Sequence, residues 1–332
     1  MTTQLLRENN AWIGCLGLRH FKTLFPVIRQ SRVVPCRDGP IFLPSQHGDV
    51  HRDCGARRIS DPEIQMKGDG SKGMGNKPPI VSGFGDDEDR QFTNSVIRLS
   101  LIAIVVSAII FTVFPGLDLF AHSLIWQDGR FVLDGDPFWS GFRQFLLDFT
   151  KLFYLVCVVA VVLALRSNRR VMGLASDAWG YILICSLLGP GLLVNLILKA
   201  FIPRPRPREV IDFGGSLDFA SIPGFGGACD SNCSFVSGEV ASTVMTLAAL
   251  AFVVPSRRPL IAFLVLPGWL IVGAMRMGQG GHFLSDVLFS GLFMILLAAV
   301  VFRYSFISPL PLPNSWKSRM QGWFTPKGSA GS

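Results

Sequence analysis

Residues 276–302 read RMGQGGHFLSDVLFSGLFMILLAAVVF, a short polar segment followed by a long apolar run. From Leu284 to Phe302 the run carries Asp286 as its charged residue. Its length approaches the ~20 residues that a helix needs to cross ~30 Å of hydrocarbon. This stretch therefore predicts a transmembrane helix whose ionisable side chains gather at one end.

Earlier parts of the chain repeat this pattern. The whole chain is 49% hydrophobic and 16% charged, whereas a soluble domain usually carries about 25% charged residues. We therefore predict an all-α membrane protein, a six-transmembrane-helix bundle with a kink at Pro190. The predicted spans are residues 99–114, 152–165, 181–198, 237–254, 260–275 and 284–302.

Basic residues follow every second span, and short loops rich in Lys and Arg stay in the cytoplasm. These residues are Arg166, Arg169, Arg170, Arg257, Arg258, Arg303, Lys317 and Arg319. An even number of spans then puts both termini in the cytoplasm. Residues 115–147, 199–236 and 276–283 would face outward.

The predicted bundle covers residues 95–305, with a cytoplasmic tail at 306–332. Residues 1–94 are rich in Gly, Pro and charge without a sustained period, which indicates a disordered cytoplasmic tail. Its start lacks the apolar core and cleavage site of a secretory signal. An alternative is that the protein begins at Met66 or Met74.

Charge and cysteines narrow the class of protein. The formal net charge is +8, but the basic residues lie between apolar runs rather than in one stripe, which argues against a nucleic-acid partner. Cys157 and Cys185 lie inside spans and are predicted to be packing residues. Cys229 and Cys233 lie on an outward loop, where a disulfide and two free thiols both remain open. The tail cysteines show no metal-ligand spacing, so no metal site is predicted.

Three segments place polar groups where a span meets an outward loop. They are residues 199–207 (KAFIPRPRP), 233–239 (CSFVSGE) and 276–286 (RMGQGGHFLSD). The first belongs to a loop with Lys199, Arg204, Arg206 and Arg208, although outward loops usually carry few basic residues. Ionisable groups at such depth usually mark a functional site.

These segments contain the groups that phosphoryl transfer needs. Lys199, Arg206 and Arg276 suit a phosphate dianion, since guanidinium groups match its oxygens in bidentate fashion. Ser237 and Gly238 open a predicted helix, whose free N–H groups attract anions. His282 and Asp286 are four residues apart, so we expect the carboxylate to orient an imidazole nucleophile.

Each of these residues also has a structural interpretation. Lys199 could extend from a helix end toward water, Ser237 could be only an N-cap, and Glu239 could only favour the helix dipole. His282 and Asp286 could form a structural pair. The specific signal is the combination of three spaced segments on one face of the membrane.

The pattern K-x6-R-P, S-G and R-x5-H-x3-D resembles the type 2 phosphatidic acid phosphatase superfamily of integral membrane lipid phosphatases. The resemblance implies a helical bundle and catalysis without metal or cofactor, through a phosphohistidine. It implies that His282 is the nucleophile and that Asp286 is its acidic partner. It also implies that Lys199, Arg206 and Arg276 are phosphate-binding cations and that Ser237 and Gly238 are further phosphate donors.

The sequence departs from the family pattern twice. Met275 precedes Arg276 where the family usually has Ser, and Glu239 stands where the family has the His that serves as general acid. We expect either that a protonated Glu239 serves as the acid or that the leaving group needs little help.

Phosphate chemistry at the outer face of a bacterial inner membrane implies a phosphorylated lipid substrate within the bilayer. The Ser-Gly-Glu variant after Cys-x3-Cys is similar to bacterial lipid phosphatases, some of which act on lipid A, so we expect dephosphorylation of lipid A at the periplasmic face. We expect an aromatic platform for the headgroup at Trp126, Phe131, Phe138 and Trp139.

Several alternatives remain. Undecaprenyl diphosphate, phosphatidylglycerophosphate and phosphatidic acid are other candidate substrates. The missing His leaves open a non-catalytic protein that binds phosphorylated lipid. A transporter is a further alternative, although the chain shows no internal repeat.

Overall fold

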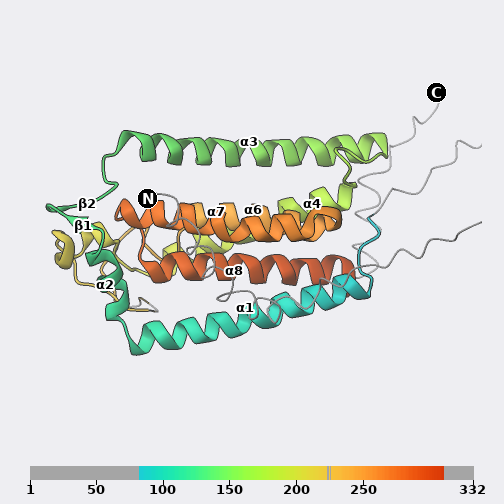
Figure 1. The fold of residues 1–332 in the computed structure, drawn as a ribbon. Coiled ribbons are helices and arrows are strands. Elements are labelled where there is room, and N and C mark those ends of the chain that lie inside the picture. Colours follow the sequence, from blue (N-terminus) through green and yellow to red (C-terminus); the bar gives the residue numbers. More distant parts are fainter. Residues whose placement is uncertain (1–81, 223, 225, 310–332) are drawn as a thin grey trace, which may run out of the picture. The chain divides into compact units, whose positions relative to one another are not determined.

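The computed structural model describes residues 82–222, 224 and 226–309, and this part of the chain is mainly helical (Figure 1). The predictions made for residues 1–81 and 310–332 lie outside the described residues. The chain begins with α1 (Asp87–Val113), followed by α2 (Gly116–Ser123), the hairpin β1 (Trp126–Gln127) and β2 (Arg130–Phe131), and α3 (Pro137–Ser167).

The second half continues with α4 (Ser176–Ser186), which passes without a break through a π-helical stretch (Leu187–Leu198) into α5 (Lys199–Phe201). Pro190 lies inside the π-helical stretch, where it cannot donate a backbone hydrogen bond. After a long loop come α6 (Gly238–Val253), α7 (Arg258–Gly278) and α8 (Leu284–Phe302).

Within the part of the chain that the structure describes, five helical segments are long and apolar enough to cross a membrane, which confirms a helical membrane protein. They are Asp87–Val113, Pro137–Ser167, Ser176–Phe201, Pro255–Gly278 and Leu284–Ile307. The predicted span at 237–254 corresponds to α6, whose 16 residues are apolar but shorter than the others. The count of six spans and the cytoplasmic termini therefore stay predictions.

The second predicted span, 152–165, was too short. In the structure α3 starts at Pro137, because the Asp136 carboxylate accepts a hydrogen bond from Trp139 N at 2.9 Å and caps the helix. Polar residues such as Gln144 and Asp148 interrupt the apolar run but pair along the helix, so they do not end it.

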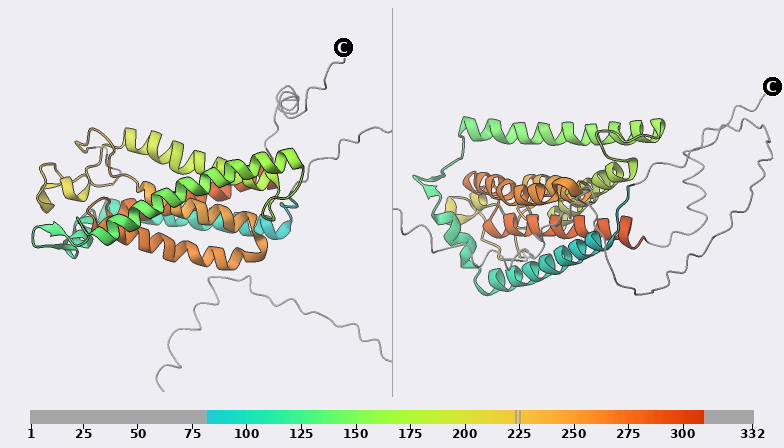
Figure 2. Two further views of the ribbon diagram at one scale, coloured as in Figure 1. Left: turned by 90° about the horizontal axis from the view of Figure 1, so that it is seen from above. Right: turned by 45° about the vertical axis from the view of Figure 1, so that its right-hand side comes forward.

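The core lies where α6 and α8 pack together, with α7, α4 and α1 around them (Figure 2). In the segment Leu284–Ile307, which contains α8, 56% of the most apolar stretch of 18 residues is buried, whereas in α3 the buried share is 11%. The exposed face of α3 carries apolar side chains such as Leu152 and Leu155, as expected of a helix that faces lipid.

One end of the bundle carries the long connections, residues 115–136, 202–237 and 279–283, and is here called the loop end. A second apolar cluster of Phe131, Val210, Phe213 and Phe283 packs there. Phe131 is only 2% exposed, so its assignment to an exposed aromatic platform was wrong, whereas Phe138 is 70% exposed.

Arg204 ties the loop end together from a fully buried position. Its guanidinium donates to Asp118 of α2 at 2.7 Å and to Asp286 of α8 at 2.5 Å. Further bonds reach the Ser285 hydroxyl at 2.8 Å and the Ala220 carbonyl at 2.9 Å. A buried cation with every partner in place fixes the loop 202–237 on two helices.

Arg204→Met should destabilise the protein strongly, because Asp118 and Asp286 would then face each other without their cation. We expect a loss of about 3–5 kcal/mol, as for other broken buried ion pairs. Thermal unfolding of the purified protein in detergent measures it. Arg208→Met, at an exposed position of the same loop, is the control. Equal stability of the two variants would contradict this assignment.

Candidate active site

The three polar segments of the sequence meet at the loop end. Lys199 lies in the last turn of the long helix that starts at Ser176, and Gly238 begins α6. A Cβ atom added to Gly238 would lie 3.6 Å from the Lys199 Nζ atom, so the ammonium lies beside the start of α6. The third segment lies at the same place because its Arg276 and His282 face the carboxylate of Glu239, which belongs to the second segment.

Glu239 Oε2 lies 3.5 Å from Arg276 Nε and 3.9 Å from His282 Nε2. This one carboxylate therefore joins the start of α6 to the end of α7 and to the loop before α8. Arg276 and His282 are almost completely buried, at 5% and 1% exposure. The expected convergence of Arg276, His282 and Glu239 is present in the structure.

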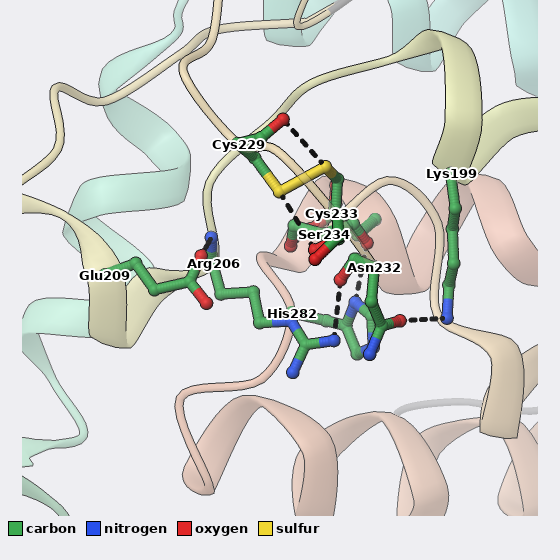
Figure 3. Close-up of a disulfide and its surroundings, with 10 residues drawn as sticks. Lys199, Arg206, Glu209, Cys229, Asn232, Cys233, Ser234 and His282 are labelled. Carbon is green, nitrogen blue, oxygen red and sulfur yellow. Dashed lines mark hydrogen bonds between the residues drawn. A yellow bond between two sulfur atoms is a disulfide. The ribbon is translucent and has the colours of Figure 1, made fainter.

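Asn232 connects the other two cations. Lys199 Nζ donates to its side-chain oxygen at 3.2 Å, and Arg206 Nη2 donates to its backbone carbonyl at 2.7 Å. Figure 3 shows Lys199 and Arg206 reaching Asn232 from two sides, with His282 nearby. Sequence reasoning missed Asn232, since a polar residue in a Gly-rich loop carries no signal of its own.

A disulfide joins Cys229 to Cys233 and closes a short loop that contains Asn232 (Figure 3). The same loop borders an open cavity of about 440 Å³. Its lining residues are Asn195, Lys199, Ala200, Cys229, Asp230, Ser231, Asn232 and Cys233. Lys199 therefore borders both Asn232 and a space that a headgroup could enter. Cys157 and Cys185 are buried and free, as predicted.

His282 has a defined tautomer in this structure. Its Nδ1 lies 2.7 Å from the Ser234 carbonyl oxygen, which can only accept, so Nδ1 carries the proton. Burial lowers the pKa of His282 well below its ordinary value, and the nearby Arg276 charge adds to this effect. A neutral ring with a proton on Nδ1 leaves the Nε2 lone pair free toward Arg276 and Glu239.

The expected hydrogen bond between His282 and Asp286 does not form. α8 begins at Leu284, so His282 precedes the helix, and the four-residue spacing does not put both side chains on one helical face. Asp286 instead accepts from Arg204, from Ser234 Oγ at 2.5 Å and from Phe283 N at 2.8 Å. Asp286 is connected to His282 through Ser234, whose hydroxyl donates to Asp286 and whose carbonyl contacts the ring.

The surroundings of Glu239 do not suit a general acid. Arg143 of α3 donates to Glu239 Oε1 from Nε at 3.0 Å and from Nη2 at 2.8 Å, while Arg276 lies at the other oxygen. Two guanidinium groups stabilise the ionised carboxylate, which has no proton to donate. Arg143 was missed because it lies outside the three segments, in what sequence reasoning took for a loop.

Ser237 is the N-cap of α6, with its hydroxyl 3.5 Å from Val240 N. Ser237 and Gly238 thus open the helix as predicted, and the start of α6 points its N–H groups at the region of Lys199 and Glu239. Among the described residues there is no group of three His, Cys, Asp or Glu side chains that could hold a metal ion.

The arrangement combines a neutral buried imidazole with four cations, Lys199, Arg206, Arg276 and Arg143, around one internal carboxylate. Such a pocket can bind a phosphate group and present a nitrogen nucleophile to it.

Comparison with known proteins agrees with this chemistry. Residues 178–308 match the PAP2 superfamily model. The chain is 32% identical over 210 residues to a lipid A 4'-phosphatase of Francisella tularensis subsp. novicida, covering 62% of this chain and 94% of the relative. A lipid A 4'-phosphatase of Rhizobium etli is 33% identical over 216 residues, covering 58% and 80% of the two chains.

A lipid A 4'-phosphatase of Rhizobium leguminosarum is 43% identical over 115 residues, covering 35% of this chain and 49% of the relative. No solved structure matches the chain. The family match, the two long alignments and the helices that can span a membrane agree with one another. The chain therefore belongs to the PAP2 superfamily, and it is a lipid phosphatase.

Proposed function

We propose that the protein removes the 4'-phosphate of lipid A at the periplasmic face of a bacterial inner membrane. The observation that carries this proposal is the free Nε2 of buried His282 beside Arg276, within a pocket ringed by cations. The lipid A 4'-phosphatases of Francisella and Rhizobium supply the substrate class.

In the proposed reaction His282 Nε2 attacks phosphorus and forms a phosphohistidine, while the bond from phosphorus to the sugar oxygen breaks. Water then attacks phosphorus, the P–N bond breaks and inorganic phosphate leaves. The Ser234 carbonyl accepts a hydrogen bond from Nδ1, which stabilises the cationic ring of the intermediate. Asp286 supports this step by holding the Ser234 hydroxyl.

Three cations bind the phosphate oxygens in this proposal. Arg276 approaches from the end of α7, where it lies beside Glu239, while Lys199 and Arg206 are both hydrogen-bonded to Asn232. The Gly238 amide at the start of α6 lies beside Lys199 and adds a backbone donor.

The membrane orientation is part of the proposal. α3 ends at Ser167, near the basic residues Arg169 and Arg170, and α7 begins at Arg258. Both points lie at the end of the bundle opposite the loop end (Figure 1). If these basic connections stay in the cytoplasm, α6 completes a sixth span and the loop end faces the periplasm.

His282→Ala should abolish phosphate release, because no other group replaces the nucleophile; we expect a loss of at least about a thousand-fold. Arg276→Lys should lose about ten- to a hundred-fold, since an ammonium cannot form the two-pronged contact. The assay is mass spectrometry of lipid A incubated with the purified protein, with and without a chelator, which should change nothing.

The same assay compares undecaprenyl diphosphate, phosphatidylglycerophosphate and phosphatidic acid. Preferred release from one of these would replace lipid A as the substrate. Tight binding of a lipid phosphate without release would favour the non-catalytic alternative. Full activity of His282→Ala would remove His282 from the mechanism.

The disulfide should control how well phosphate binds. Replacing Cys229 and Cys233 together by Ser frees the loop that holds Asn232, so KM should rise about ten-fold, comparable to losing one hydrogen bond to a charged group. The turnover number should change less, because His282 is held by Ser234. A reductant should reproduce the effect in the native protein and add nothing in the double variant. An unchanged KM in both experiments would contradict this role.

A further inference from the structure

Arg143 reaches the candidate active site from a helix that contributes no residue to the three polar segments. It lies near the start of α3, and its ion pair with Glu239 of α6 bridges 96 positions of sequence. The Arg143 side chain is 40% exposed and that of Glu239 is 12% exposed. The pair therefore lies between the buried His282 ring and the exposed surface of the protein.

The two oxygens of Glu239 face different groups. Oε2 faces Arg276 and His282, whereas Oε1 accepts both hydrogen bonds from Arg143. Arg143 thus lies across the carboxylate from the attacking nitrogen. In an in-line displacement the leaving oxygen also lies across the phosphorus from the nucleophile.

Arg143 has donor capacity left for a ligand. Its Nε and Nη2 atoms bind Glu239, and within the described residues its Nη1 atom has no hydrogen-bond partner. A guanidinium held by one carboxylate and open on its other edge can donate to an oxygen that enters the pocket.

The leaving group needs such a donor. A sugar or alkyl alkoxide is a poor leaving group, and Glu239 is ionised between two guanidinium groups, so it cannot supply a proton. A donor aimed at the oxygen on which charge develops lowers the barrier without transferring a proton.

We propose that Arg143 is a further catalytic residue, which donates a hydrogen bond to the oxygen that links the phosphate to the lipid, with Glu239 holding it in place. This inference rests on the proposed phosphatase function.

The bond from His282 Nε2 to phosphorus forms, and the electron pair of the breaking P–O bond passes to the lipid oxygen beside Arg143. That oxygen takes a proton from water, which leaves hydroxide to attack the phosphohistidine. The P–N bond then breaks, and hydrogen phosphate and neutral His282 result.

The test is the dependence of rate on the leaving group. The full-length protein in detergent hydrolyses lipid A and a series of aryl and alkyl phosphomonoesters, from good to poor leaving groups. Arg143→Ala should lose about a hundred-fold or more on lipid A and alkyl esters, but only a few-fold on p-nitrophenyl phosphate. Lys151→Ala, at an exposed position of the same helix, should leave all rates unchanged.

Glu239→Gln provides a second measurement. It removes the anion from beside Arg276, so inorganic phosphate should inhibit this variant more strongly than the native protein. It also loosens Arg143, so turnover of poor leaving groups should fall in the same order as for Arg143→Ala. If Arg143→Ala does not fold, as judged by thermal unfolding, Arg143→Lys takes its place in the series.

An equal loss on all leaving groups would overturn the proposal, because it would make Arg143 a phosphate-binding or structural residue. Unchanged rates on lipid A would overturn it as well. Failure of the proposed function is a separate result, because it would appear as absent phosphate release by the native protein on every ester.

Discussion

Like charges at the loop end repel one another, and the geometry of the site follows from how that repulsion is balanced. Arg276 lies beside the buried ring of His282, and Lys199 and Arg206 add to the same field. Two unit charges 4 Å apart interact by about 4 kcal/mol near a protein surface. Glu239 provides the opposite charge where Arg276, His282 and Arg143 meet. In the proposed function an incoming phosphate dianion shares this role, and without phosphate the Glu239 carboxylate balances the cations.

A second group of buried charges, centred on Arg204, is connected to the first group through Ser234. Arg204 binds Asp118 and Asp286, and Asp286 in turn binds the Ser234 hydroxyl. The Ser234 carbonyl then fixes the tautomer of His282. Asp286 follows His282 by four residues, but its hydrogen bonds go to Arg204, Ser234 and the Phe283 amide and not to the His282 ring. In this arrangement Asp286 contacts the residue whose carbonyl binds the His282 ring, and the charge of Asp286 is balanced mainly by Arg204.

The sequence predicts those features that depend on local spacing. The spans appear as apolar runs, and Lys199, Arg206, Arg276 and His282 stand out because ionisable residues are rare next to membrane spans and usually mark a site. Arg143 and Arg204 could not be assigned, because their partners lie 96 and 82 positions away and local periodicity carries no such pairing. The shared helical face of His282 and Asp286 was predicted wrongly, because a helix starting two residues later looks identical in sequence.

The position of the site along the helices bears on the choice of substrate. Lys199, Glu239 and Arg276 lie at helix ends, while the apolar faces of α1 and α3 are exposed along their length. In the proposed function a lipid keeps its acyl chains against these faces while its phosphate reaches His282 at the loop end. Arg143 stands near the start of α3, between that apolar face and Glu239. Selection for a phosphorylated lipid would thus follow from where the cations stand relative to the bilayer, with the headgroup contacting the cavity beside Lys199.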